Sequence, residues 1–496
     1  MSEQYKAFSE HLKQIGVIGS IGGVLAWDNE VYKPEKAAGI RAEQNAFISG
    51  LIHEKFTSPE FEKTVHALLE DKSLTKEQAI NVKKVSDDLI KQKKFTTEFI
   101  QRQSMLISEA FGKWHAAKTQ NNFSLFEGSL EKIVALCQET AEIIGYKEHP
   151  YDALLDMYEP GMTTAKLKVI FAKVKEELVP YYNSLLAKKP VDNSFVHLKY
   201  EKQKQWDVSI ELLKQMGYDF GGGRQDYAPH PFSISIHPTD VRITTRVDEN
   251  NLVELIWSTI HECGHALYEQ GLDQQYFGQP QCSPASLGIH ESQSRLWENN
   301  VGRGLSYWKA NYHLLQKAFP ENLGKVDVHS FYKAINKVQP GFIRTNADEI
   351  SYHLHVLIRF EIEVALMENK IAVKDLPAFW NAKYKEYLGV DVPSDTSGVL
   401  QDVHWSHGSL GYFPTYSIGS FYAAQLFQHA EKNLPELKTK IEKGELNELL
   451  SWLSTNIHSK GKLYTSEEIC EQATGEGLNF SYFMNYIKTK YDGIYA

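Results

Sequence analysis

The fold and function of this chain are organised around His261-Glu262-Cys263-Gly264-His265, inside a largely apolar run from Leu252 to Gly271. In an α-helix, residues four positions apart share a face, so both imidazoles could reach one metal ion. Glu262 would lie about 100° round the helix from His261, close enough to hold a water molecule beside that ion. Two histidine ligands and a glutamate general base are typical of zinc hydrolases.

The surrounding residues predict a helix over this run. Asn250 and Asn251 offer N-cap side chains, and Glu254 suits the first turn. Gly264 is the weak point, because glycine costs about 1 kcal/mol relative to alanine in a helix interior. We expect a glycine there to let another segment approach the ligand face.

Composition restricts the class of protein. The 496 residues are 42% hydrophobic and 23% charged, as in ordinary globular proteins, and the net charge of −10 argues against a nucleic-acid surface. No apolar run approaches the roughly 18 residues that cross a bilayer. The first residues lack the basic and apolar regions of a signal peptide. Four widely spaced cysteines are typical of reduced thiols, so we expect a cytoplasmic protein with no membrane partner.

Most of the chain has the apolar period of helices. The first two predicted helices cover Tyr5 to Ile15 and Ala37 to Phe56, separated by Gly22-Gly23 and Pro34. The second has an apolar stripe that includes Phe47. Further helices are predicted over Lys76 to Lys94, Thr97 to Lys118, Leu130 to Ile144, Ala165 to Leu186, Phe421 to Ala430, Glu445 to Trp452 and Leu478 to Ile487.

One β-hairpin is predicted immediately before the helix that contains His261. Apolar and polar residues alternate over His230 to Ile236 and again over Val241 to Val247, with a turn at His237-Pro238-Thr239-Asp240. The edge of this hairpin could pair with an extended peptide, or the hairpin could serve packing alone.

A third metal ligand is expected, because catalytic zinc sites take three protein groups. The candidate carboxylates are Glu269, Glu291 and Glu298. Glu269 lies one turn beyond His265, where its reach back to the metal would be awkward. Glu291 belongs to a second helix, beginning near Pro284, that can cross the first, so we prefer it. His290 is a rival ligand.

Six motifs in this order resemble those of the carboxypeptidase Taq family of thermostable metallocarboxypeptidases. They are His230-Pro231-Phe232, Asp240-Val241-Arg242-Ile243-Thr244, His261 to His265, His290-Glu291-Ser292, Ile343-Arg344-Thr345-Asn346-Ala347-Asp348, and Gly398-Val399-Leu400-Gln401-Asp402-Val403-His404-Trp405. The resemblance covers essentially the full length, and no motif position departs from the pattern.

The resemblance implies that His261, His265 and Glu291 bind zinc, or possibly cobalt, with Glu262 as general base. It implies a mainly α-helical, two-lobed peptidase with a deep groove and a small sheet beside the active-site helix. It also implies a cytoplasmic homodimer that releases C-terminal residues one at a time with broad preference. We expect one peptidase unit over residues 1–496, with a helical part at 1–220, the site motifs at 221–420 and C-terminal helices at 421–496.

Amide hydrolysis needs hydrogen-bond donors for the tetrahedral oxyanion. His404, Tyr412 and Tyr416 are plausible donors. A histidine and a tyrosine have this role in the similar helical zinc peptidases, so we nominate His404 and Tyr416 and keep Tyr412 as the rival.

An exopeptidase also needs a cation for the terminal carboxylate of its substrate, and the planar fork of arginine suits this task. Arg344 is the first choice and Arg242 the second, although either could instead form a structural ion pair. Asp348 could orient Arg344 or a ligand histidine. Gln401 and Tyr412 complete the predicted substrate-binding set.

The sequence thus predicts a zinc-dependent carboxypeptidase acting on peptides. The alternatives are an oligopeptidase or dipeptidyl carboxypeptidase of the same helical class, and a peptide-binding protein without catalysis. The intact Glu262 argues against the last alternative.

Overall fold

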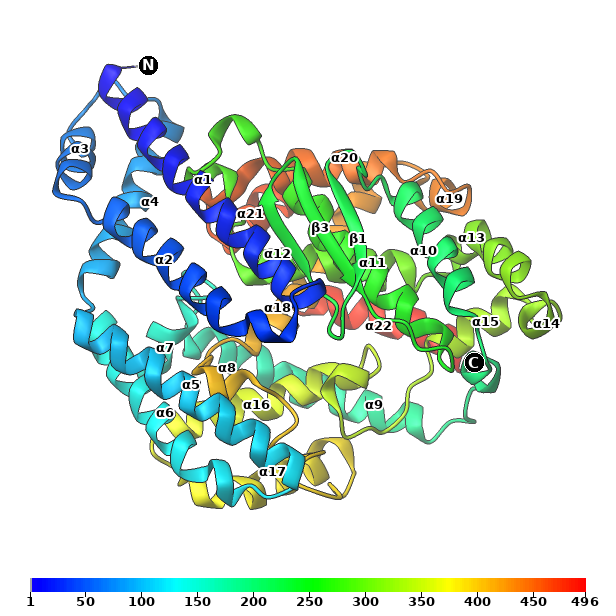
Figure 1. Cartoon of the computed structure of the whole chain (residues 1–496). Coiled ribbons are helices and arrows are strands. Elements are labelled where there is room, and N and C mark those ends of the chain that lie inside the picture. The colour runs from blue at the N-terminus through cyan, green and yellow to red at the C-terminus, as the bar shows by residue number, and fades with distance from the viewer. Residues whose placement is uncertain (1) are drawn as a thin grey trace. The chain divides into compact units, whose positions relative to one another are not determined.

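The computed structural model describes residues 2–496, and the predicted fold class is confirmed: the described chain is mainly helical with one small sheet (Figure 1). The chain forms two compact units, each made of three segments. Unit 1 consists of Met1–Lys93, Asp192–Ile335 and Tyr422–Leu478, and unit 2 of Lys94–Val191, Asn336–Phe421 and Asn479–Ala496. The predicted single peptidase unit over residues 1–496, with its three consecutive parts, stays a prediction. The groove implied by the resemblance stays a prediction.

Unit 1 contains the sheet and most of the motifs around His261. Its helices are α1 (Glu3–Val31), η1 (Glu35–Ala37), α2 (Ala38–Phe56), α3 (Pro59–Leu69), α4 (Lys76–Lys93), η3 (Ser194–His197), α10 (Lys202–Met216), α11 (Leu252–Gln270), η4 (Gln274–Tyr276), η5 (Pro280–Cys282), α12 (Leu287–Arg295), η6 (Leu296–Gly302), α13 (Leu305–Ala318), α14 (Pro320–Leu323), α15 (Val328–Ile335), α19 (Leu437–Glu442), α20 (Asn447–Asn456), η10 (His458–Leu463) and α21 (Ser466–Thr474).

In unit 2 the described residues form helices and loops and no strand. Its helices are α5 (Thr97–Gln120), α6 (Ser124–Ile144), α7 (Pro150–Leu155), α8 (Thr164–Lys173), η2 (Val174–Leu178), α9 (Val179–Leu186), η7 (Arg344–Asn346), α16 (Ser351–Met367), η8 (Val373–Asp375), α17 (Leu376–Leu388), η9 (His404–His407) and α22 (Ser481–Ile494). Helix α18 (Pro414–Asn433) begins in unit 2 and ends in unit 1. Nearly every residue of α16 is buried, so this helix forms the centre of the core of unit 2.

The sheet has the strand order β1-β3-β2. Strands β2 (Ser233–His237) and β3 (Asp240–Thr245) form the predicted antiparallel hairpin. Strand β1 (Gly223–Tyr227) pairs in parallel with β3, and the sequence analysis did not predict it. Its residues, Gly-Arg-Gln-Asp-Tyr, lack the apolar alternation of a strand, so only its pairing partner reveals it. Helix α11 packs on β2 and β3, and α1 lies against β2 (Figure 1).

Helix α1 corrects one prediction. The sequence predicted a helix from Tyr5 to Ile15, but the helix continues to Val31. The glycines are tolerated because they allow close packing. A Cβ atom at Gly16 would lie 3.1 Å from the backbone of Gly278, and one at Gly23 would lie 3.4 Å from the side chain of Ile236 on β2. Tertiary contact therefore outweighs the low helix propensity of glycine.

Helix α2 has the predicted bounds within one residue, but its apolar stripe does not form a core. None of its residues is buried, and the side chain of Phe47 is 67% exposed. The periodicity therefore predicted the helix correctly and its burial wrongly.

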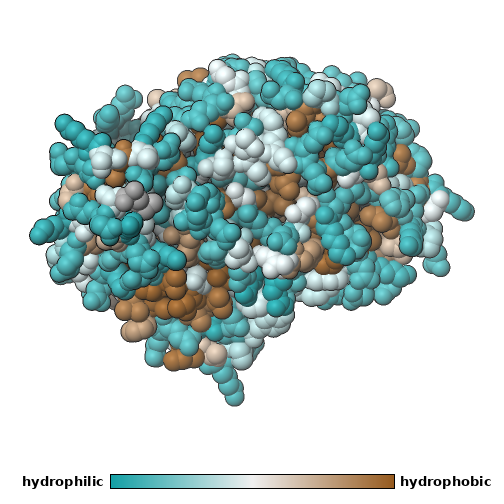
Figure 2. Space-filling view, turned by 90° about the horizontal axis from the view of Figure 1, so that it is seen from above, coloured by the Kyte–Doolittle hydropathy of each residue, from teal (hydrophilic) through white to brown (hydrophobic). Residues whose placement is uncertain are grey.

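Hydrophilic side chains cover most of the face in Figure 2, in keeping with the charge of the chain.

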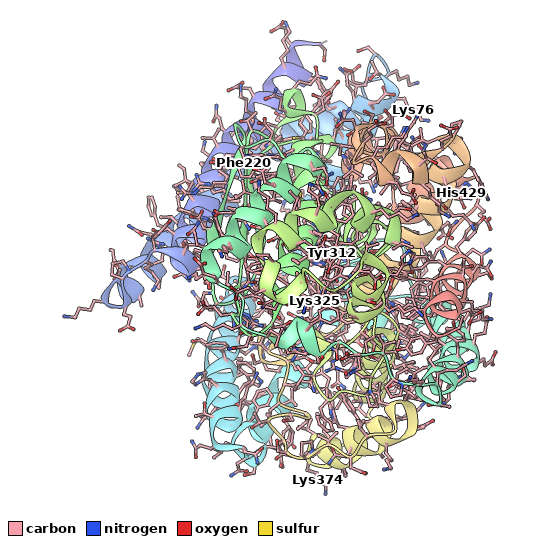
Figure 3. The ribbon with its side chains drawn as sticks, turned by 90° about the vertical axis from the view of Figure 1, so that its right-hand side faces the viewer. Lys76, Phe220, Tyr312, Lys325, Lys374 and His429 are labelled. Atoms are coloured by element: carbon pink, nitrogen blue, oxygen red, sulfur yellow. The ribbon has the colours of Figure 1, made fainter. Side chains whose placement is uncertain are left out.

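Aromatic packing joins the helices that follow the central motifs. Tyr312 of α13, labelled in Figure 3, is buried with its ring centroid 4.7 Å from that of Phe331 on α15. Its hydroxyl group donates to the carbonyl oxygen of Val326.

Across residues 2–496, every helix is too short or too polar to span a lipid bilayer.

Helices α11 and α12 approach each other closely at Gly264. A Cβ atom there would lie 2.6 Å from the Cα atom of Ser294 and 2.7 Å from the carbonyl oxygen of Gln293. Both atoms belong to the backbone of α12, so the clash could not be relieved by a side-chain rotation. The expectation that Gly264 admits a second segment is confirmed.

This contact predicts the effect of adding one methyl group. We expect Gly264→Ala to lower the free energy of unfolding by about 1–2 kcal/mol, because overpacking outweighs the better helix propensity of alanine. Gly50→Ala is the matched control, since nothing lies within 4 Å of a Cβ atom at this position in α2. The control should be neutral or stabilising. Urea unfolding followed by circular dichroism measures both, and equal stability of the two variants would contradict the prediction.

Candidate metal centre

Three predicted ligands in unit 1 converge on one point. Helix α11 presents His261 and His265 one turn apart, and α12 presents Glu291. The Nε2 atom of His265 lies 3.4 Å from Oε2 of Glu291, and Nε2 of His261 lies 3.8 Å from the same oxygen. One donor atom from each of the three side chains lies within 4.8 Å of the others. Two imidazoles and a carboxylate form the donor set of catalytic zinc sites, so these residues fit a divalent metal ion.

A buried charge network surrounds Glu291. The guanidinium group of Arg295 donates to Oε1 of Glu291 at 2.7 Å and to Oε2 of Glu298 at 2.9 Å. Arg303 donates to the other oxygen of Glu298. Glu298 also accepts a hydrogen bond from Nδ1 of His261 at 2.9 Å. Two arginines therefore balance two buried carboxylates, which makes their burial possible.

Burial and this network set the charges of Glu291 and His265. Burial alone would favour a neutral carboxyl group, but Arg295 and His261 hold the pKa of Glu291 well below its usual range. The same balance of burial against Arg295 and His261 lowers the pKa of Glu298. Burial lowers the pKa of His265 to about 3, so its imidazole is neutral at pH 7. A carboxylate and a neutral imidazole are the protonation states that bind metals.

Glu269 and His290, the other candidate ligands, make different contacts. Glu269 and His290 do not join the three converging donors. Instead, Nε2 of His290 lies 2.9 Å from Oε1 of Glu269, and Nδ1 of His290 lies 2.6 Å from Nδ1 of His265. The sequence preference for Glu291 over its rivals agrees with this geometry.

Glu262 lies beside the converging donors on α11, with a 7% exposed side chain. Burial raises the pKa of Glu262 to about 7 despite the opposing influence of His261. Its neighbour Cys263 is fully buried, and burial raises the pKa of that thiol.

Arg344 lies in unit 2, within a second buried charge network. Its guanidinium group donates to Asp402 through both Nε and Nη2, and to the hydroxyl group of Tyr352 at 2.9 Å. Arg359 on α16 donates to the other oxygen of Asp402 at 2.7 Å. Although burial favours the neutral acid, these two arginines hold the pKa of Asp402 well below its usual range.

The partner of Arg344 is thus Asp402, rather than the predicted Asp348. Asp348 accepts hydrogen bonds from the backbone N–H groups of Ile350 and Ser351, at the start of α16. It also accepts one from the hydroxyl group of Ser351. Its role is therefore to cap a helix, which satisfies donors that the first turn leaves unpaired.

Gln401 has no hydrogen-bonding capacity left for a substrate. Its amide oxygen accepts from the backbone N–H of Arg344 and from Nη2 of Arg359, both at 2.9 Å. Its amide nitrogen donates to the carbonyl oxygens of Phe342 and Ser397. These contacts assign Gln401 to the support of Arg344 and do not favour the predicted contact with substrate.

His404 and the two candidate tyrosines form one cluster in unit 2. Nε2 of His404 lies 3.2 Å from the hydroxyl oxygen of Tyr416. The ring of Tyr412 lies 5.3 Å from that of His404 and 5.4 Å from that of Tyr416. Burial lowers the pKa of His404 to about 3, so its ring is neutral. The indole of Trp405 and the backbone N–H of Gly411 donate to the buried Glu363, which anchors this segment.

Arg242, the second choice for binding the carboxylate, is held by its own strand. It donates to both oxygens of Asp240, at 2.7 and 2.8 Å. Its guanidinium carbon lies 4.5 Å from the ring centroid of Trp27 on α1. These contacts favour the structural ion pair and link α1 to the sheet.

Sequence reasoning missed Arg295, Asp402 and Arg359. One signal was available: Glu291, Arg295 and Glu298 have the spacing of a single helix face, which predicts the ion pairs between them. No comparable spacing relates Asp402 to Arg359, because these residues meet only in the folded chain.

Comparisons with known proteins agree on the family. The sequence model described as "Carboxypeptidase Taq (M32) metallopeptidase" matches residues 7–491. Carboxypeptidase 1 of Bacillus subtilis is 39% identical over 495 residues, covering 99% of this chain and 98% of that protein. Thermostable carboxypeptidase 1 of Thermus thermophilus is 38% identical over 508 residues, covering 99% of each. A solved structure of an M32 carboxypeptidase from Deinococcus radiodurans R1 has 35% identity and a TM-score of 0.98 over 100% of both chains.

The chain therefore belongs to the carboxypeptidase Taq (M32) family of metallopeptidases.

Proposed function

We propose that this protein is a zinc-dependent carboxypeptidase that removes residues one at a time from the C-terminus of peptides. His261, His265 and Glu291 hold the metal, and Glu262 is the general base. The convergence of three donor atoms within 4.8 Å, with Glu262 buried on the same helix, is the observation that carries this proposal.

Zinc bound by these ligands would polarise the scissile carbonyl group and lower the pKa of a bound water molecule to about 7. Glu262 accepts the proton of the attacking water and then donates it to the leaving nitrogen. Burial supports this role, because a carboxyl group with a pKa of about 7 can both accept and release a proton near neutral pH.

We assign oxyanion stabilisation to Tyr416 and His404, with Tyr412 as the alternative donor. Nε2 of His404 lies 3.2 Å from the hydroxyl oxygen of Tyr416, so the two side chains are close enough to donate to one oxyanion. The guanidinium group of Arg344 lies 4.8 Å from the ring centroid of Tyr416 and also favours a developing negative charge.

We assign the terminal carboxylate of the substrate to Arg344. Asp402 and Tyr352 hold its guanidinium group in one orientation, which lowers the entropy lost on binding a carboxylate. Arg242 is the alternative candidate, and Asp240 holds one edge of its guanidinium group as Asp402 holds one edge of that of Arg344. We further propose zinc as the metal, with cobalt as a substitute, a broad side-chain preference, a homodimer and a cytoplasmic location, all from the family resemblance.

The first test is the pattern of products. A short peptide incubated with the protein should lose residues singly from its C-terminus, and a C-terminal amide should block this loss because Arg344 then lacks a carboxylate. A chelator should stop the reaction, and added zinc should restore it. Mass spectrometry of a time course distinguishes the alternatives: dipeptide release or internal cleavage would replace our proposal with a dipeptidyl carboxypeptidase or an oligopeptidase.

The second test concerns Glu262. We expect Glu262→Gln to lower kcat by about 100- to 10,000-fold, because the amide keeps the shape of the side chain but cannot accept a proton. Zinc content, measured by atomic absorption, should stay at the parental level, since Glu262 is not a ligand. A variant that contains zinc and keeps its full rate would eliminate Glu262 as the general base.

The third test compares the two arginines. Arg344→Gln removes a charged hydrogen-bonding partner of the substrate carboxylate, a contact worth about 1.5–3 kcal/mol. We therefore expect kcat/KM for peptides with a free carboxylate to fall by about 10- to 100-fold. Arg242→Gln is the matched control, and it should lower the melting temperature rather than kcat/KM. Steady-state kinetics with calorimetry of both variants gives the answer, and the reverse pattern would move the carboxylate site to Arg242.

A further inference from the structure

A hydrogen-bonded chain of three side chains in unit 1 ends on one proposed ligand and includes two residues with no role so far. Glu269 Oε1 lies 2.9 Å from Nε2 of His290, and Nδ1 of His290 lies 2.6 Å from Nδ1 of His265. The rings of His265 and His290 are 4.4 Å apart with an interplanar angle of 30°. The three side chains are between 12% and 18% exposed, so little water competes for these bonds.

The position of each hydrogen along this chain follows from the proposed metal site. Nε2 of His265 is the atom that lies 3.4 Å from Glu291, so it is the atom that would bind the metal and must keep its lone pair. An imidazole with a lone pair on Nε2 has its one N–H group at Nδ1, so Nδ1 of His290 accepts the hydrogen of His265. Nε2 of His290 in turn donates to Oε1 of Glu269.

The other ligand reaches the same tautomer by a different route. Glu298 accepts directly from Nδ1 of His261, which places the lone pair of His261 on its Nε2 atom. Glu298 is also bound by Arg295 and Arg303, so its charge is already balanced. The partner of His265 is the imidazole of His290 instead of a carboxylate. Glu269 contacts the other nitrogen of that imidazole.

We propose that Glu269 and His290 are positioning residues for the metal, forming a relay that fixes the tautomer and the ring orientation of His265. This inference rests on the proposed metal site. Both ring nitrogens of His290 are occupied by Glu269 and His265, so His290 cannot also act as a ligand. A packing role would need the volume of His290, whereas the relay needs an acceptor at the position of its Nδ1 atom.

Two substitutions at His290 separate these roles. His290→Asn places a carbonyl oxygen near the former Nδ1 position and keeps an acceptor for His265. His290→Leu has a similar size but no acceptor. We expect the leucine variant to bind zinc about 10- to 100-fold more weakly than the parent, the usual effect of losing such a partner. The asparagine variant should retain most of the affinity.

Zinc affinity is measured on the full-length protein by competition with a chelating dye, and the visible spectrum of the cobalt-loaded protein gives a second readout. The leucine variant should change the cobalt absorption bands, because the orientation of His265 is no longer fixed, while the asparagine variant should resemble the parent. Melting temperatures of the metal-free proteins show whether each variant is folded.

A second pair of variants tests whether Glu269 acts through His290. Glu269→Leu should weaken zinc binding in the parent, because the tautomer of His290 is then free to change. In the His290→Asn background it should have no further effect, because an amide at this position no longer links Glu269 to His265. Such non-additivity is the mark of coupled residues. Additive losses would overturn the relay and leave two independent packing effects.

The outcomes separate this inference from the proposed function. If the parent binds neither zinc nor cobalt, the proposed function fails and the relay fails with it. If the parent binds zinc but leucine and asparagine at position 290 are equivalent, whether both tight or both weak, only the relay is overturned. Tight binding by the asparagine variant together with weak binding by the leucine variant supports the relay.

Discussion

The close crossing of α11 and α12 is the constraint on which the proposed metal centre depends. The two histidines occupy one face of α11, and their third partner comes from a different helix. Only a glycine at position 264 allows the backbone of α12 to approach within the distances observed. At that separation the Oε2 atom of Glu291 lies 3.8 Å from Nε2 of His261 and 3.4 Å from Nε2 of His265. The residue with the least favourable helix propensity in α11 is therefore the one that assembles the site.

Burial of so many charges is possible because nearly all of them are paired. Arg295 and Arg303 balance Glu291 and Glu298 in unit 1, and Arg344 and Arg359 share Asp402 in unit 2. Removal of one partner from such a network leaves a buried charge without compensation, which is far more costly than the pair is stabilising. These networks consequently hold their side chains in one geometry, which a metal ligand or a carboxylate-binding arginine requires.

Two adjacent carboxyl groups illustrate how environment divides chemical roles. Glu262 and Glu291 are both buried close to the same histidines, yet burial raises the pKa of one and the nearby Arg295 lowers that of the other. Glu291 is consequently a permanent anion, suited to hold a cation. Glu262 can exchange a proton near neutral pH. Opposite shifts in neighbouring titratable groups commonly distinguish the acid–base residue from its supporting partners.

The sequence by itself determined the local features of this protein. A period of 3.6 residues predicted most helices, alternation predicted the hairpin, and the spacing of His261 and His265 placed two imidazoles on one helix face, because each pattern reflects geometry within a single element. The family motifs added the choice of Glu291. Only the tertiary structure decided what depends on contact between distant segments: the parallel pairing of β1, the continuation of α1 through its glycines, the exposure of α2, and Asp402 as the partner of Arg344. Those contacts join residues remote in the chain, and their energies come from packing and charge pairing that no local pattern records.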